Sequence, residues 1–188
     1  MYAGIDYSMS SPGLVVGNSS NPDELMYYGF RQKKKQVSTK PNIILMEYPE
    51  YTCNEERYSK LASIFVEILK KNDVKKVWLE GYAYGATGNV FNIGENTGVL
   101  KNLLWLAGIE FEAIAPNVAK KYLTGKGNAN KTAMFESYIA KTSHQLDKLI
   151  DDERKGDKIP SPVNDLIDAY TMLQVGLNNY QTETLQTQ

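Results

Sequence analysis

Residues 1–8 read MYAGIDYS, an apolar opening strand that contains one carboxylate, Asp6. An unpaired carboxylate in apolar surroundings costs several kcal/mol or gives up its charge. No lysine or arginine occurs in this stretch to pair with it. The rest of the chain must therefore bring a cation to Asp6.

Two short strands after the first one predict an antiparallel meander. Residues Ser10 to Gly13 form a turn signal, Leu14 to Gly17 resume a strand, and Glu24 to Phe30 give a third strand after another turn cluster. The apolar run Ile43 to Met46 is too short to assign to a helix or a strand.

Two strand–helix–strand units follow the meander. Apolar residues recur at intervals of three and four from Glu55 to Asn72, which predicts an amphipathic helix. Val77 to Leu79 then form a continuous apolar strand that ends at Glu80. A helix from Ile93 to Ala107 and a strand from Ile109 to Ala115 repeat the unit. Right-handed crossovers make these strands parallel, so the pattern predicts an α/β fold with a mixed five-stranded sheet.

Smaller elements fill the region before the last helix. Pro116 to Tyr122 and Lys131 to Lys141 are predicted to be helical, and the polar stretch Thr142 to Ile159 is predicted to be a surface excursion. The last helix is predicted from Pro162 to Gly176.

The last helix carries two acids on one face. Asp165 and Asp168 are three residues apart, so their side chains point in similar directions. Both lie in the first two turns, where the helix dipole favours negative charge.

Composition indicates one folded domain. The 188 residues are 42% hydrophobic and 23% charged, which is typical of a folded protein. We expect a single nuclease domain over residues 1–177 and a flexible tail over residues 178–188. No apolar run reaches the roughly 18–20 residues of a membrane span, and no leader pattern is present, so we expect a cytoplasmic protein without membrane contact.

Cysteine and histidine are each represented once. The lone Cys53 excludes an intrachain disulfide and a cysteine-based zinc site. The lone His144, in a Ser-His-Gln context, is expected to be exposed on a helix.

One region of the sequence is basic and free of acids, although the formal net charge is −1. Residues 117–135 contain no acid and include four lysines, which favours a contact with nucleic acid but is equally compatible with a solvated basic surface. These lysines are Lys120, Lys121, Lys126 and Lys131.

Four acids stand at informative positions, namely Asp6, Glu80, Asp165 and Asp168. Like charges that converge in a core repel one another unless a cation separates them. Oxygen ligands without histidine or thiolate suit Mg²⁺, with Mn²⁺ as a substitute. Two such ions, about 3.5–4 Å apart, support in-line hydrolysis of a phosphodiester. The acids therefore predict a two-metal nuclease site.

The motifs around these acids resemble those of the RuvC-type Holliday junction resolvases. The resemblance spans nearly the whole chain and includes the basic segment before the final helix. It rests on Gly4-Ile5-Asp6-Tyr7-Ser8, Trp78-Leu79-Glu80, Asn164-Asp165-Leu166-Ile167-Asp168-Ala169 and Ala115-Pro116-Asn117-Val118-Ala119-Lys120-Lys121.

The resemblance implies a ribonuclease H-like fold, metal ligation by the four acids, a homodimer with two active sites, and paired nicking of branched DNA such as a four-way junction. The helix 93–107 is broadly apolar and serves either the core, which is the safer default, or a two-fold interface. Compact size and low basic charge suit a phage-encoded branch, which would place the protein in the host cytoplasm. The candidate phosphate contacts are Lys101, Lys120, Lys121, Lys126 and Lys131.

The loop after Glu80 departs from the family pattern. Family members often carry an aromatic wedge three residues after this glutamate, where this chain has Ala83. Tyr82 and Tyr84 flank that position and are candidates for stacking on an unpaired base, although tyrosines in a glycine-rich loop also serve ordinary packing.

Three other functions share features of this sequence. A ribonuclease H acting on RNA–DNA hybrids uses a similar acid cluster. Phosphotransferases of the actin and sugar kinase type also begin with Gly-Ile-Asp, but they need two lobes, for which this chain is too short. A non-catalytic nucleic-acid-binding module would have no use for four mutually repelling acids.

Overall fold

The computed structural model describes residues 1–81, 90–151, 156 and 158–186, and of residues 183–186 the backbone alone. Its centre is a six-stranded sheet with the order β4-β3-β2-β1-β5-β6. The strands are β1 (Tyr2–Asp6), β2 (Gly13–Gly17), β3 (Met26–Phe30), β4 (Ile43–Met46), β5 (Lys76–Glu80) and β6 (Glu110–Ile114). The helices are η1 (Pro22–Glu24), α1 (Asn54–Lys71), α2 (Val90–Leu106), α3 (Pro116–Thr124), α4 (Lys131–Thr142), α5 (Leu146–Leu149) and α6 (Val163–Gln186).

The sheet is mixed, as the sequence predicts. β1, β2 and β3 form the antiparallel meander, and β1, β5 and β6 are parallel. The prediction of five strands is wrong by one, because the run Ile43–Met46 is a strand that pairs parallel with β3. As an edge strand it has Ile43 buried and its other residues half-buried, so its sequence lacks the alternation that identifies a half-buried strand.

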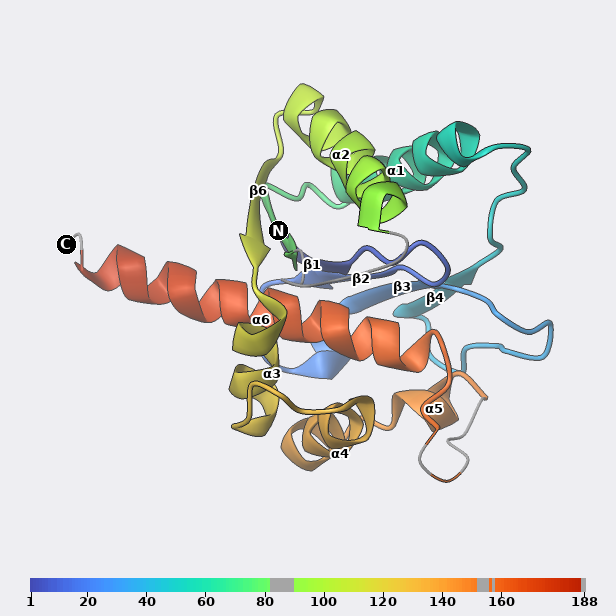
Figure 1. Ribbon diagram of the computed structural model, residues 1–188. Helices are drawn as coiled ribbons and strands as arrows, with labels where there is room; N and C mark the ends of the chain where they lie inside the picture. Colours follow the sequence, from blue (N-terminus) through green and yellow to red (C-terminus); the bar gives the residue numbers. More distant parts are fainter. Residues whose placement is uncertain (82–89, 152–155, 157, 187–188) are drawn as a thin grey trace.

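Helices cover both faces of the sheet. α1 and α2 lie on one face, and α3, α4, α5 and α6 lie on the other (Figure 1). The predicted apolar stripe of α1 is confirmed, since Tyr58, Leu61, Phe65 and Leu69 are all buried. None of the described helices is both long and apolar enough to cross a lipid bilayer.

Three glycines allow α6 to lie directly on the sheet. A Cβ at Gly4 of β1 would lie 2.1 Å from the carbonyl oxygen of Ala169, and one at Gly13 of β2 would lie 2.6 Å from that of Asp165. On the helix itself, a Cβ at Gly176 would lie 1.9 Å from the Trp78 ring. Because no side chain separates helix and strand, the start of α6 comes close to the end of β1.

The last helix is longer than its sequence pattern suggests. It continues past the predicted end at Gly176 to Gln186, so residues 178–186 of the expected flexible tail are helical here. Tyr180 contributes to this continuation by packing on Tyr2, with ring centroids 5.5 Å apart. The flexibility of the tail stays a prediction.

The polar stretch 142–159 is not a simple surface excursion. It contains α5 and buries Leu146, Ile150 and Ile159 in the core below the sheet. The apolar positions in this stretch are separated by polar residues and follow neither the helical nor the strand period. The sequence pattern therefore did not reveal that they are buried.

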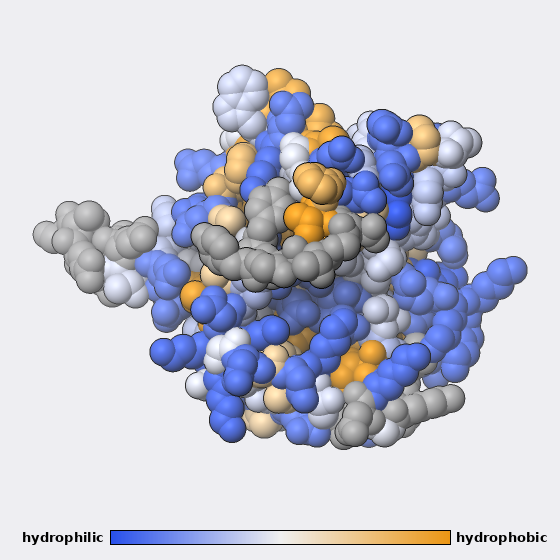
Figure 2. Space-filling view, in the orientation of Figure 1, coloured by the Kyte–Doolittle hydropathy of each residue, from blue (hydrophilic) through white to orange (hydrophobic). Residues whose placement is uncertain are grey.

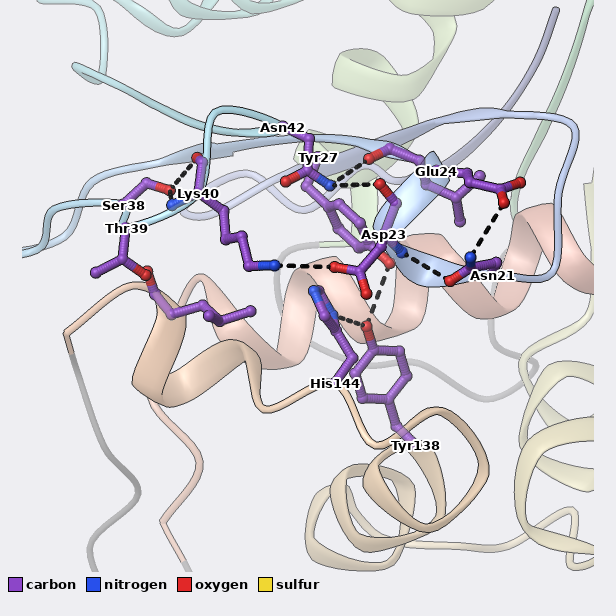
Figure 3. A network of polar contacts seen from close by, with 12 residues as sticks. Asn21, Asp23, Glu24, Tyr27, Ser38, Thr39, Lys40, Asn42, Tyr138 and His144 are labelled. Carbon is purple, nitrogen blue, oxygen red and sulfur yellow. Dashed lines mark hydrogen bonds and ion pairs between the residues drawn. The ribbon is translucent and has the colours of Figure 1, made fainter.

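The prediction for His144 is also wrong. Its side chain is 6% exposed, and its Nδ1 lies 2.7 Å from the hydroxyl of Tyr138, which in turn contacts the hydroxyl of Tyr27 (Figure 3). Burial lowers the pKa of His144. The histidine therefore helps to join β3 to the α4–α5 region.

Candidate active site

Two of the predicted acids lie at the same edge of the sheet. Asp6 is the last residue of β1 and Glu80 is the last residue of β5. The two strands are parallel neighbours, with Ile5 opposite Leu79, so their carboxyl ends meet. The sheet topology alone thus brings the two carboxylates together.

The other two acids come from α6. Gly4 and Gly13 let the helix backbone touch β1 and β2, which sets the first turns of α6 beside Asp6. All four acids line one pocket, with a volume of about 290 Å³. Its lining residues are Asp6, Ser8, Glu80, Pro116, Ala119, Lys120, Lys131, Met134, Asn164, Asp165, Asp168 and Met172.

Asp6 is buried among the charges of the three other acids. Its side chain is buried, and this loss of solvation raises its pKa well above the usual range. The negative charges of Asp168, Asp165 and Glu80 raise the pKa further, while Lys131 acts in the opposite direction. The repulsion expected from the sequence is therefore present in the fold.

The carboxyl group of Asp168 has a raised pKa, so it stays protonated up to about neutral pH. Burial raises its pKa to about 7, with smaller contributions from Glu80 and Asp165. Glu80 opens into the pocket, but nearby atoms desolvate it and raise its pKa as well, against the opposing charges of Lys120 and Lys131.

Asp165 has one oxygen satisfied and one unsatisfied. Its Oδ1 accepts a hydrogen bond of 3.0 Å from Nδ2 of Asn164. Its Oδ2 is buried and has no hydrogen-bond partner among the described residues. Burial raises the pKa of Asp165. The nearby hydroxyls of Ser11 and Ser161, which do not meet the geometry of a hydrogen bond to Oδ2, partly oppose the shift together with Lys131.

The predicted lysines divide into two groups. Lys120 of α3 and Lys131 of α4 line the pocket with the acids. Lys121 and Lys126 are exposed on α3 and the loop that follows it. Lys101 belongs to α2, in the helical layer on the other face of the sheet, and does not line the pocket (Figure 1).

The two candidate stacking tyrosines, Tyr82 and Tyr84, lie outside the described residues. Their proposed contact with an unpaired base stays a prediction.

The pocket has the donor set of a site for a hard divalent cation. It offers four carboxylates, and the buried Oδ2 of Asp165 lacks a partner that a cation would supply. Within the described residues, no group of three acid, histidine or cysteine side chains is already arranged to hold a metal ion. The donors fit Mg²⁺ or Mn²⁺ in kind, and their side chains would have to converge on the ion.

Sequence reasoning missed several residues that shape the pocket. Ser8 lies two positions after Asp6, so an extended chain turns both side chains to the same side. Asn164 orients Asp165 and is itself contacted by Oγ of Ser161, 3.2 Å away. Asn164 directly precedes Asp165 in the sequence, and this position could have identified it as a partner of that carboxylate.

One sequence relative is the crossover junction endodeoxyribonuclease RuvC of Brachyspira hyodysenteriae, which is 32% identical over 87 residues. The match covers 44% of this chain and 54% of that protein, so the chain spans about half the length of this curated relative. No protein-family model matches the chain.

Solved structures match over almost the whole chain. RuvC from Thermus thermophilus aligns with a TM-score of 0.57 and 19% identity, covering 96% of both chains. The chain has the RuvC-type fold. The same Thermus protein in complex with a Holliday junction substrate aligns with a TM-score of 0.59 and 18% identity, over 92% of this chain and 89% of that one.

A more distant resolvase also shares the RuvC-type fold. The yeast mitochondrial Holliday junction resolvase aligns with a TM-score of 0.54 and 14% identity, over 100% of this chain and 84% of that one. The comparisons thus confirm the resemblance drawn from the sequence motifs and the predicted ribonuclease H-like architecture.

Proposed function

We propose that this protein is a divalent-metal-dependent endonuclease that resolves Holliday junctions or other branched DNA by paired nicks. The observation that carries the proposal is that Asp6, Glu80, Asp165 and Asp168 line one pocket of a RuvC-type fold. Two structural neighbours support the substrate class, since one is described with a Holliday junction substrate and another as a Holliday junction resolvase.

The four carboxylates would hold two Mg²⁺ ions, with Asp6 between the ligands from β5 and α6. When bound, the ions lower the pKa of an attacking water and stabilise the charge that grows on the departing 3′ oxygen. The acids must be ionised to bind them. Lys131 favours that ionised form, because its positive charge lowers the pKa of Asp6, Glu80 and Asp168.

The lysines in the pocket have a separate task. Lys120 and Lys131 line the same space as the acids, where the scissile phosphate would enter. Their ammonium groups would offset the repulsion between a phosphate and four carboxylates, and would orient the phosphate for attack.

A homodimer would supply the second active site that paired nicks require. The supporting observation is the apolar surface of α2, where Phe91, Trp105 and Leu106 are 85%, 72% and 64% exposed. Exposed large apolar side chains along one helix, two of them adjacent at its end, are typical of protein–protein interfaces. We assign this helix to the two-fold interface.

The test is a magnesium-dependent cleavage assay with labelled four-way junctions, forks, flaps, linear duplexes and RNA–DNA hybrids. Paired, symmetrical nicks in the four-way junction that exceed cleavage of linear duplex by at least an order of magnitude support the proposal. Preferential cleavage of the hybrid would replace it with a ribonuclease H, and tight magnesium-dependent binding of ATP would replace it with a phosphotransferase.

A further inference from the structure

Three consecutive lysines lie in a connection that the proposed site does not use. Lys33, Lys34 and Lys35 belong to the segment between β3 and β4, and all three are exposed. We call these three residues the lysine loop. Figure 1 shows the β3–β4 connection projecting past the end of α6 that begins at Val163.

The lysine loop leaves the sheet at the same edge as the acids. Asp6 lies opposite Gly13 in the register of β1 and β2, and Gly13 lies opposite Gly29 in the register of β2 and β3. Neighbouring strands are about 4.8 Å apart, so Gly29 lies roughly 10 Å from Asp6. β3 ends at Phe30, only three residues before Lys33.

A fully buried side chain fixes the base of the loop. Oε1 of Gln36, which is 0% exposed, accepts hydrogen bonds from the backbone N–H groups of Gln32 and Lys33, at 2.6 and 3.1 Å. Its Nε2 donates to the carbonyl oxygen of Ser161 at 2.8 Å, four residues before Asp165. A buried polar side chain satisfied in this way holds its neighbours firmly.

Further contacts tie the connection to the site and to its flanks. Nε2 of Gln32 donates to the carbonyl oxygen of Ser10 at 3.3 Å, in the turn that follows Asp6. Arg31 pairs with Glu47 at 3.2 Å, just before the lysines. The loop is therefore anchored to two segments next to the acids, the turn that follows β1 and the residues just before α6.

We propose that the lysine loop binds the phosphate backbone of a DNA arm that extends from the active site. The inference rests on the proposed nuclease function and adds a contact surface to it. Phosphates of one strand follow one another about every 3.4 Å along the duplex, so a cationic surface roughly 10–20 Å from the scissile phosphate meets phosphates a few nucleotides away.

The charge distribution explains why such a contact is needed. Four acids line the pocket, and the protein as a whole carries a formal net charge of −1. The net charge of the protein therefore does not attract DNA, and local groups of lysines must do so. Hydrophilic residues cover the right-hand margin of the face shown in Figure 2, where the β3–β4 connection runs. Lys120 and Lys131 act inside the pocket, and the lysine loop acts beyond it.

The test compares two triple variants that remove the same charge. Lys33→Gln/Lys34→Gln/Lys35→Gln removes the loop lysines. Lys70→Gln/Lys71→Gln/Lys75→Gln removes three exposed lysines at the end of α1 and in its connection to β5, which enters the sheet at the end opposite to Glu80. Fluorescence anisotropy measures the affinity of each protein for a labelled four-way junction and a linear duplex in calcium, over a range of salt concentrations.

We expect the loop variant to bind both DNAs at least about tenfold more weakly at moderate salt, and its salt dependence to be shallower by as much as about 2–3 in log–log slope. The control variant should stay within about twofold of the parent. Equal losses in the two variants, or none in the loop variant, would overturn the inference.

The parent protein separates this inference from the proposed function. If the parent binds linear duplex and junction equally and does not nick the junction, the junction-resolving function fails, while a selective loss in the loop variant still supports the lysine loop as a phosphate contact. If the parent nicks junctions and the loop variant binds like the control, the lysine loop inference alone fails. A parent that binds neither DNA contradicts both.

Discussion

Asp168 shows most directly what burial of a carboxylate in this pocket costs. Its unfolded-state pKa is near 3.8, and burial raises the folded-state pKa to about 7. Between these values the folded chain retains a proton that the unfolded chain has released, so the free energy of unfolding falls as pH rises through this window. The metal-free site is therefore least favourable above neutrality, and a bound cation would reverse this effect.

Asp168→Asn should stabilise the metal-free protein at about pH 8 by on the order of 2–4 kcal/mol, with no gain near pH 4, because the amide carries no charge to bury. Urea denaturation in the presence of a chelator, repeated across this pH range, measures the difference. Adding Mg²⁺ should then stabilise the parent more than the variant. A gain that does not depend on pH would show that charge is not its origin.

The proposed ligands should be separable from DNA binding. Asp6→Asn, Glu80→Gln and Asp165→Asn should each reduce magnesium-dependent nicking by at least about a thousandfold, since each removes a charged donor, yet leave junction affinity in calcium within a few-fold of the parent. Single-turnover nicking and anisotropy measure the two effects. Asp73→Asn, at an exposed site, is the matched control, and nicking by the three variants at its rate would refute the site assignment.

At this scale the sequence predicted that the four acids come together, while their role as metal ligands stays a prediction, and it placed the histidine wrongly. Asp6, Glu80, Asp165 and Asp168 follow from strand ends and helix spacing, which are local patterns, and the structure brings all four to one pocket. His144 is buried because distant residues pack around it, and no local pattern records that. The absence of a lysine or arginine in β1 was informative, since the cations near Asp6 come from other elements.

At the scale of elements, α6 organises the site because it lies without intervening side chains on the sheet. The sequence predicted this helix as far as Gly176, but its end at Gln186 was missed, since most residues from Asn178 onward are polar. β4 was missed because four residues are too few to show a period. Contacts between elements, not local sequence, decide both features.

Gly176→Ala should destabilise the protein by about 3 kcal/mol, because the added methyl group would overlap the Trp78 ring, which is 1% exposed and has no room to move. Chemical denaturation and the emission of the buried tryptophan measure the effect. The matched control is Gly94→Ala in α2, where a Cβ meets nothing within 4 Å. It should stabilise the protein by about 0.5–1 kcal/mol through helix propensity. Equal effects would contradict the close packing of α6 on β5.

At the scale of the whole molecule, the two layers of helices have different tasks. The layer with α3, α4 and α6 supplies the lysines and two of the acids, while the layer with α1 and α2 buries one core and leaves apolar residues of α2 exposed. The sequence left open whether α2 packs in the core or forms a two-fold interface. Leu100 and Leu104 are core residues, whereas Trp105 and Leu106 face solvent. The helix therefore has one apolar face in the core and another that is exposed.

Trp105→Glu should convert the proposed homodimer to a monomer, because a carboxylate in the centre of an apolar interface would have to be desolvated without a partner. Sedimentation velocity at several protein concentrations measures the change, and Val37→Glu, which alters another exposed apolar residue, should leave the dimer intact. The monomer should still nick one strand of a junction at a time. The two nicks in one junction should become independent events, so that singly nicked junctions accumulate. A parent that sediments as a monomer at every concentration, or a Trp105→Glu variant that remains dimeric, would exclude α2 as the two-fold interface.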